Sequence, residues 1–253
     1  MSVDRRLLAR YLRQRRELGE REVFLDRLTA EEAVAALRTA RAVPAVAPSD
    51  AAPSTTGTGP RAAGSAAEGL RILGAEAATC TRCRLHEGRN SVVFGVGDPE
   101  AELVVVGEAP GFEEDRTGLP FVGPAGKLLD LMLLSIGFPR ESVYICNVLK
   151  CRPPNNRDPQ RDEVEACSAY LRRQLDLIAP RALLAVGKFA AQTLTGSDVS
   201  IGRLRGRVHE YRGTPLVATY HPAFLLRSRQ WTRAAWQDLQ LLREVLDTSA
   251  TSA

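Results

Sequence analysis

The sequence is poor in aromatic residues and in lysine, and it lacks any long hydrophobic run. Aromatic residues make up 6% of the 253 residues, and only Lys127, Lys150 and Lys188 are lysines among the 34 basic residues. No apolar run approaches the roughly 18 residues that a membrane-spanning helix needs. The charged segment 1–16 has no apolar stretch of the kind that secretion signals contain. These absences predict a soluble cytoplasmic protein with no membrane partner.

Cysteine and histidine are scarce as well, with five and three residues. In a reducing compartment, five cysteines favour metal ligands or buried thiols over a disulfide framework. The formal charge of +4 rests almost entirely on arginine. Arginine suits phosphate contacts, but a GC-rich genome produces the same abundance of Arg and Ala. Charge alone therefore assigns no partner.

The composition divides the chain into three parts. Residues 1–40 carry leucines at helical spacing and a capping-box pattern, which predict a helical N-terminal extension. Residues 41–69 are rich in Ala, Pro, Ser, Thr and Gly without periodicity, which predicts a flexible linker. Residues 70–253 form the main domain and contain all the motifs considered below.

From about residue 77 onward, apolar segments of strand length alternate with helical patterns. Strands are expected at 103–106, 143–147, 182–186 and 216–219, and helices at 126–136, 159–178, 188–195 and 231–246. Segment 113–126 is expected to be non-helical, because Gly and Pro are frequent in it. The alternation predicts an α/β fold with a mostly parallel sheet covered by helices. In such folds, loops at the carboxyl ends of the strands form the functional site.

Four cysteines have the pattern of metal ligands. Cys80 and Cys83 form a C-x2-C pair, and Cys151 and Cys167 supply two further thiols. Four thiolates suit either a structural zinc ion or a [4Fe–4S] cluster, and their spacing does not choose between the two. Cys146 lies inside an apolar strand and is predicted to be a packed core thiol.

Polar residues follow several of the predicted strands. The turn at 107–111, with sequence GEAPG, brings backbone N–H groups close to any ligand above the sheet. Asn147 ends a strand, where an amide can contact a base edge or simply cap a turn. His221 follows the last strand and precedes Pro222, a position that suits a functional or a structural histidine. The sequence around Lys127 does not match G-x4-G-K-[ST], so a phosphate-binding P-loop is excluded.

The order of these motifs resembles the family 4 uracil-DNA glycosylases, the iron–sulfur branch of their superfamily. The resemblance covers about residues 77–247, from the C-x2-C pair through GEAPG, EDRTGLPFVGPAG and NVLKCRPPNNR to HPAFLLR. It implies a three-layer α/β/α fold and an enzyme that extrudes uracil from DNA and hydrolyses the N-glycosidic bond. The abasic site left behind starts base excision repair. It also implies a [4Fe–4S] cluster as cofactor, held by Cys80, Cys83, Cys151 and Cys167.

The resemblance further implies how uracil would be held. Phe121 would stack on the extruded base, and Asn147 would hydrogen-bond uracil O4 and N3–H. Backbone groups around Glu108 and Ala109 would hold the O2 side of the base. His221 would donate a hydrogen bond to O2, where negative charge develops, and is the main catalytic candidate.

Further roles concern water and DNA. Better-known members of the superfamily place a water-positioning Asp or Asn where Ala109 stands, and the iron–sulfur branch resembles this chain in lacking it. Glu108 and Glu114 are the carboxylates expected to orient water or stabilise the sugar cation. Leu225, Leu226 and Arg227 are expected to wedge into the duplex and hold phosphate, although Leu225 and Leu226 could equally be core residues. The expected partner is uracil-containing DNA, single- or double-stranded, bound by a monomer.

Other interpretations meet specific objections. A non-catalytic nucleic-acid-binding module would explain the cysteines and the charge, but not the set of Phe121, Asn147 and His221. A base deaminase would need H-x-E and P-C-x-x-C, whereas Cys80 follows Thr and has no H-x-E upstream. A relative that traps uracil-DNA covalently would be favoured by an added His-bearing loop after Cys151, which the sequence lacks.

Overall fold

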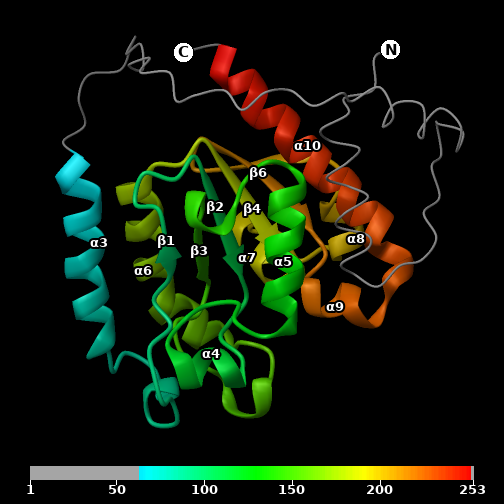
Figure 1. Ribbon diagram of the computed structural model, residues 1–253. Coiled ribbons are helices and arrows are strands. Elements are labelled where there is room, and N and C mark those ends of the chain that lie inside the picture. The colour runs from blue at the N-terminus through cyan, green and yellow to red at the C-terminus, as the bar shows by residue number, and fades with distance from the viewer. Residues whose placement is uncertain (1–62, 252–253) are drawn as a thin grey trace, which may run out of the picture. The chain divides into compact units, whose positions relative to one another are not determined.

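The structure is a computed structural model that describes residues 63–251, with side chains for residues 66–248 (Figure 1). The predictions for residues 1–40 and for 41–62 lie outside the described residues. Helix α3 (Ala63–Ala78) begins inside the predicted linker, so the linker prediction is wrong for residues 63–69. The start of α3 is rich in alanine, which has the highest helix propensity. Leu70 and Leu73 on this helix are buried, and their burial stabilises it.

Six strands form one mixed sheet in the order β1-β3-β2-β4-β6-β5. They are β1 (Val96–Gly97), β2 (Leu103–Gly107), β3 (Tyr144–Asn147), β4 (Ala182–Val186), β5 (Val208–Tyr211) and β6 (Thr214–Thr219). The four central strands are parallel and the two edge strands antiparallel, so the predicted mostly parallel sheet is confirmed. The edge strands escaped prediction because β1 has two residues and β5 has no fully buried residue.

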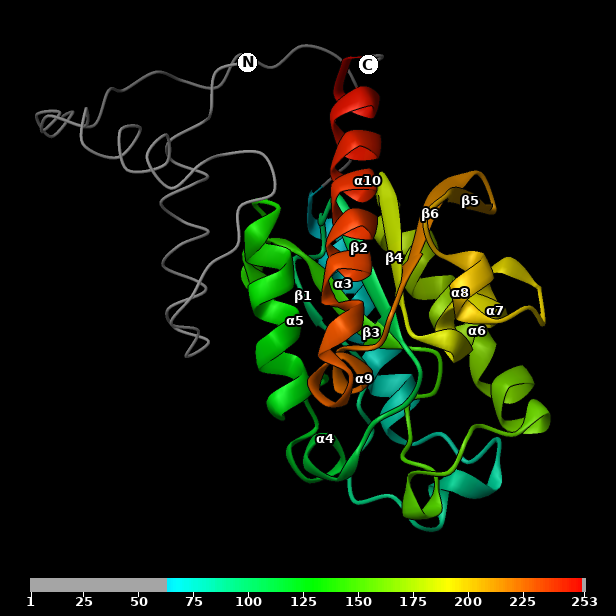
Figure 2. The same cartoon turned by 90° about the vertical axis from the view of Figure 1, so that its right-hand side faces the viewer.

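Helices cover both faces of the sheet (Figure 2). One face carries α5 (Pro124–Ser135), α9 (Pro222–Arg227) and α10 (Thr232–Thr251), and the other carries α3, α6 (Arg161–Ile178), α7 (Lys188–Thr195) and α8 (Ile201–Leu204). Successive strand residues point to opposite faces, so Val105 packs in the first layer and Val104 in the second. The three-layer α/β/α fold is therefore confirmed.

Segment 113–126 differs from its prediction, because it contributes to two helices. Helix α4 (Phe112–Thr117) starts after Gly111, whose N–H donates to the Glu114 carboxylate at 3.1 Å. It ends at Gly118, which has a φ of 74° and forms a left-handed C-cap. The expectation of a non-helical segment is wrong for residues 113–117 and 124–126. Gly118 and Gly123 cap helix ends, and Gly126 lies in the first turn of α5, so the abundance of glycine was misleading.

The carboxyl ends of the four parallel strands meet at one edge of the sheet. The register pairs Gly107 of β2 with Asn147 of β3, and Val186 of β4 with Thr219 of β6. The segments that follow these strands therefore begin side by side, as expected for a site of this fold class. None of the described helices is both long and apolar enough to span a bilayer.

Candidate active site and four-cysteine cavity

Asn147, at the end of β3, carries an unpaired buried oxygen. The residue is 2% exposed, and its Oδ1 is the sole buried side-chain nitrogen or oxygen atom without a hydrogen-bond partner among the described side chains. An unpaired buried acceptor costs about 1–3 kcal/mol, so folded proteins rarely keep one without a purpose. A Cβ at Gly107 would lie 2.3 Å from this oxygen, so the amide lies against the backbone at the end of β2.

Phe121 lies over the same glycine, because a Cβ at Gly107 would come within 2.6 Å of its ring. Its φ of 53° is left-handed, a conformation that costs an aromatic residue energy. The carboxylate of Glu114 holds the segment that follows, since it accepts hydrogen bonds from the N–H groups of Val122 at 3.0 Å and Gly123 at 3.4 Å. The surrounding fold thus keeps the Phe121 ring over the end of β2.

His221, the residue before α9, stacks on Phe121 with ring centroids 5.7 Å apart and 27° between the planes. Its Nδ1 accepts a hydrogen bond from the N–H of Ala223 at 3.1 Å. Because Nδ1 is an acceptor, the proton of the neutral ring lies on Nε2. Burial, helped by the charge of Arg227 and opposed by that of Glu114, lowers the His221 pKa to about 4. The ring is therefore a neutral Nε2 donor near pH 7.

Glu108 and Ala109 follow β2 and are half-buried. Burial and the charge of Asp158 raise the pKa of Glu108, and the charge of Lys188 opposes them. Ala109 packs against the cluster that contains Leu149. Glu114 differs from Glu108, because its carboxylate is committed to backbone N–H groups. Of the two predicted carboxylates, Glu108 is thus the better placed to contact water.

Leu225 is not exposed for the predicted DNA contact, because its side chain is 3% exposed and belongs to the core beneath α9. The next residue, Leu226, is 46% exposed, and Arg227 is exposed too. The sequence does not show which of the two leucines is buried. Neighbouring positions on a short helix lie on different faces, and only the packing of the helix decides which face is covered. The core alternative thus applies to Leu225, and Leu226 is the one of the two leucines that is exposed for the predicted DNA contact.

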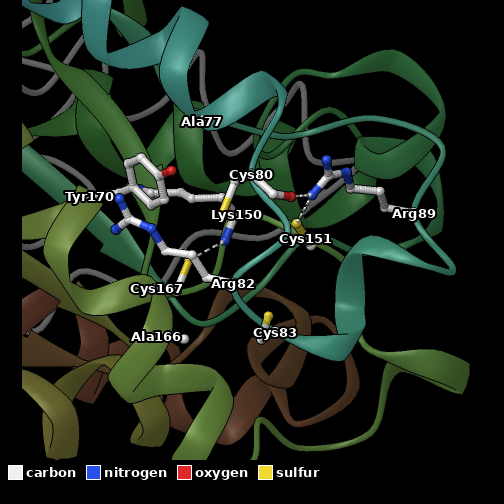
Figure 3. Close-up of a pocket in the computed structure, with 10 residues that line it drawn as sticks. All are labelled: Ala77, Cys80, Arg82, Cys83, Arg89, Lys150, Cys151, Ala166, Cys167 and Tyr170. Atoms are coloured by element: carbon white, nitrogen blue, oxygen red, sulfur yellow. Dashed lines mark hydrogen bonds between the residues drawn. The ribbon is translucent and has the colours of Figure 1, made fainter.

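The four predicted ligand cysteines line one cavity (Figure 3). Cys80 and Cys83 follow α3, Cys151 follows β3, and Cys167 lies on α6. Cys146 is fully buried in the hydrophobic core, so its prediction as a packed core thiol is confirmed. All five cysteines are free thiols. Tertiary structure therefore gathers four of them from three separate parts of the chain.

Hydrogen-bond donors and positive charge surround these sulfurs. Arg89 Nη1 lies 3.4 Å from Cys151 Sγ, and the backbone N–H of Lys150 donates to Cys167 Sγ at 3.3 Å. The Arg82 side chain also lines the cavity. Burial raises the pKa of Cys167 to about 11, and the Lys150 charge opposes this rise. Such surroundings suit a negatively charged group held by thiolates.

The cavity does not have the geometry of a site for one ion. Among residues 66–248, no three Cys, His, Asp or Glu side chains converge closely enough to hold a single metal ion. A structural zinc ion would need every sulfur at about 2.3 Å from one point. An iron–sulfur cluster takes four thiolate ligands, and the four thiols that line this cavity supply that set of donors.

The fold and the site at the strand ends define a base-excising enzyme of the uracil-DNA glycosylase type. Residues 94–240 match the family model described as the uracil DNA glycosylase superfamily. A type-4 uracil-DNA glycosylase of Archaeoglobus fulgidus is 46% identical over 186 residues, which cover 70% of this chain and 94% of the relative. The type-4 enzyme of Thermotoga maritima is 45% identical over 162 residues, covering 63% and 84%. The chain belongs to the uracil-DNA glycosylase superfamily and, within it, to the type-4 group.

Two residues of the site were not predicted from the sequence. Gly107 permits the close approach of Asn147 and Phe121, and Lys150 lies between Asn147 and the cysteines. The position of Gly107 at the very end of a predicted strand was the available signal. The sequence signal for Lys150 was weaker, since a lysine at the end of an apolar segment is most often exposed.

Proposed function

We propose that this protein extrudes uracil from DNA and hydrolyses its N-glycosidic bond. The unpaired Oδ1 of Asn147 carries the proposal, because it leaves a buried acceptor open at the centre of the site. Uracil offers a donor at N3 and an acceptor at O4 on adjacent ring atoms. An amide offers the complementary pair, with Oδ1 accepting from N3–H and Nδ2 donating to O4. The bound base would thus supply the hydrogen bond that the free protein lacks.

Phe121 would bind the extruded base, and His221 would stabilise the charge that develops on it. The Phe121 ring would stack on the extruded base, an interaction that contributes about 1–3 kcal/mol. As the bond between sugar C1′ and uracil N1 breaks, its electron pair passes to the uracil ring. The neutral His221 would donate from Nε2 to O2, where the negative charge develops, and backbone groups of Glu108 and Ala109 would hold the same side. The histidine keeps its proton and stabilises the transition state.

A water molecule must then add to C1′ and lose a proton. We propose that the Glu108 carboxylate orients this water, takes up its proton and stabilises the positive sugar, since Glu108 directly follows Gly107 at the end of β2 and its raised pKa favours proton uptake. Glu114 would act indirectly, by holding the segment that carries Phe121. Arg227 would contact a DNA phosphate from α9.

We propose a [4Fe–4S] cluster on Cys80, Cys83, Cys151 and Cys167, because these thiols share one cavity with cationic side chains. When bound, such a group cross-links α3, the end of β3 and α6 and introduces an electron-transfer centre. The free state of all five cysteines suits a reducing compartment, and we propose a cytoplasmic monomer acting on single- or double-stranded uracil-containing DNA. The glycosylase domain would start with α3, and residues 1–40 and 41–62 would precede it.

The test is excision from labelled oligonucleotides with one uracil, single-stranded or paired, followed by alkali. The expected result is strand cleavage at the uracil and none in a matched thymine oligonucleotide. A DNA adduct stable to denaturation, in place of cleavage, would indicate covalent trapping. Neither cleavage nor adduct, from protein that carries iron, would contradict the proposal.

A further inference from the structure

Lys150 is a buried lysine that contacts both sites. It is 2% exposed, and its Nζ donates to the backbone carbonyl of Asn147 at 2.7 Å. Its own backbone N–H donates to Cys167 Sγ at 3.3 Å, and its side chain lines the four-cysteine cavity (Figure 3). One residue therefore contacts the strand end that bears the uracil-contacting amide and a cysteine of the cavity.

A second buried side chain fixes the position of the lysine. Gln174 of α6 accepts a hydrogen bond from Lys150 Nζ at 2.5 Å through its amide oxygen. Its amide nitrogen donates to the Phe94 carbonyl at 2.9 Å and to the Tyr144 hydroxyl at 3.1 Å. These two bonds determine the orientation of the amide, so the oxygen has to face Lys150. The ammonium is thus held between α6 and Asn147.

The charge on this lysine has no nearby carboxylate. Both acceptors of Nζ, a carbonyl and an amide oxygen, are neutral, and no salt bridge to Lys150 occurs within the described part of the chain. A buried charge without an opposite charge is unfavourable, because the interior does not replace its hydration. The Lys150 charge acts on the Cys167 thiol of the adjacent cavity and on the buried Cys146 thiol, and it opposes the rise in the pKa of each.

We propose that Lys150 is a positioning residue that links the four-cysteine site to uracil recognition. Its hydrogen bond fixes the carbonyl of Asn147, and with it the direction in which the Asn147 amide leaves the strand. Its charge compensates the negative charge of a thiolate-bound cluster. The inference rests on the proposed function. It assigns a role to a residue whose side-chain nitrogen touches neither the base nor the metal centre.

Two substitutions separate the two contributions. Lys150→Met keeps a long unbranched side chain but removes the donor and the charge. Lys150→Arg keeps the charge but places a planar, larger head group where Nζ contacts Asn147. Lys127→Met is the matched control, because Lys127 is exposed on α5 and loses the same charge.

The experiment uses the full chain purified without oxygen. Iron per chain and the visible absorption spectrum report the cluster, and protein-film voltammetry reports its reduction potential. Single-turnover excision from a saturated uracil oligonucleotide reports alignment at the site. The protein concentration that half-saturates undamaged DNA reports DNA binding separately.

With Lys150→Met we expect a more negative reduction potential and a single-turnover rate constant lower by about tenfold or more, the loss typical of a hydrogen bond from a charged group. Loss of iron from a folded Lys150→Met protein supports the same charge compensation. Lys150→Arg should keep the wild-type potential and lose excision rate. DNA half-saturation should stay unchanged in all three variants, and Lys127→Met should match wild type throughout.

Lys150→Met with the wild-type potential and rate constant overturns the inference. If Lys150→Met does not fold, Gln174→Leu provides the test. This variant keeps the lysine charge but removes the amide oxygen that holds the ammonium in place. A wild-type excision rate in Gln174→Leu would also overturn the inference. Wild-type protein that holds iron but excises no uracil would instead contradict the proposed function. The potential shift remains measurable in that case, so the two failures are distinguishable.

Discussion

The rings of Phe121 and His221 stack on each other, with centroids 5.7 Å apart and 27° between their planes. These are the two side chains proposed to contact opposite parts of the extruded uracil. In the free protein each ring covers apolar surface of the other, and the base would take over part of this contact. The stack therefore keeps both rings aligned before DNA arrives, which lowers the ordering cost of binding.

Replacing Phe121 should weaken excision while separating its stacking role from its backbone strain. Phe121→Ala and Phe121→Gly both lose base stacking, so the excision rate should fall about 5- to 150-fold in each. The φ of 53° suits glycine better than alanine, so Phe121→Gly should be more stable than Phe121→Ala by about 1 kcal/mol. Urea unfolding of both variants measures the difference. Equal stabilities would contradict strain at this position.

His221 should make the protein sensitive to mild acid. Its pKa in the folded protein, about 4, lies below the value near 6.5 of an exposed histidine. Between these pH values the unfolded chain binds more protons, so the free energy of unfolding should fall as pH drops, by about 1–2 kcal/mol at pH 5 from this residue. Urea titrations at pH 7.5, 6 and 5 measure the slope, and His221→Gln should reduce it. An unchanged slope in that variant would exclude this cause.

The excision rate should not change with pH in the way that the protonation of an exposed histidine would produce. Because His221 is proposed to act as a neutral donor, its protonation should not change the excision rate between pH 5.5 and pH 8. Single-turnover rates across this range, measured with substrate saturating, test the point. A rate that rises as pH falls through about 6.5 would mean that the charged imidazolium is the active form.

Asn147→Asp should shift the base that the protein excises from uracil towards cytosine. The change removes the amide donor to uracil O4 and supplies an acceptor for the cytosine amino group. A carboxyl kept protonated by burial can also donate to cytosine N3. We expect most uracil excision to be lost and weak cytosine excision to be gained, strongest at low pH, in single-turnover assays of matched oligonucleotides. Uracil excision at the wild-type rate would show that Asn147 does not select the base.

Gly107→Ala should damage the site without affecting the cysteines. The added Cβ would lie 2.3 Å from Asn147 Oδ1 and 2.6 Å from the Phe121 ring, so both groups have to move. Displacements near 1 Å cost about 100-fold in rate, and we expect a loss of that order with full iron content. Gly88→Ala is the matched control, since a Cβ at Gly88 meets no atom within 4 Å. Equal activity of both variants would contradict the close packing at Gly107.

The cysteines should differ in their effect on iron. Cys151→Ser should lose most of about four irons per chain, because it removes a proposed ligand. Cys146→Ser should retain iron, since Cys146 lies in the hydrophobic core away from the cavity. Metal analysis of anaerobically purified protein gives the result. Stoichiometric zinc without iron in the wild-type protein would contradict the cluster.

The sequence by itself determined the four central strands, the helices α5, α6, α7 and α10, and the family. Apolar strands such as 103–106 and 182–186 are fully buried. A continuous run of apolar residues is typical of a strand that is buried on both faces, so the sequence indicates these strands directly. The cysteine pair, the carboxamide at a strand end and the histidine before Pro222 are local patterns, so they could be recognised without coordinates. Helix α4 was missed because glycines at helix ends and glycines in loops look alike in composition.

Tertiary structure alone decided which side chains face each other. Leu225 and Leu226 are equivalent in sequence, and only the packing of α9 buries the first and exposes the second. The orphaned oxygen of Asn147 became visible once its surroundings were known. Lys150 would pass for a surface lysine until its contacts with Gln174 and Asn147 are seen, because these partners belong to a distant helix and a strand end. Side-chain contacts between distant segments depend on three-dimensional packing, which no local pattern of residues encodes.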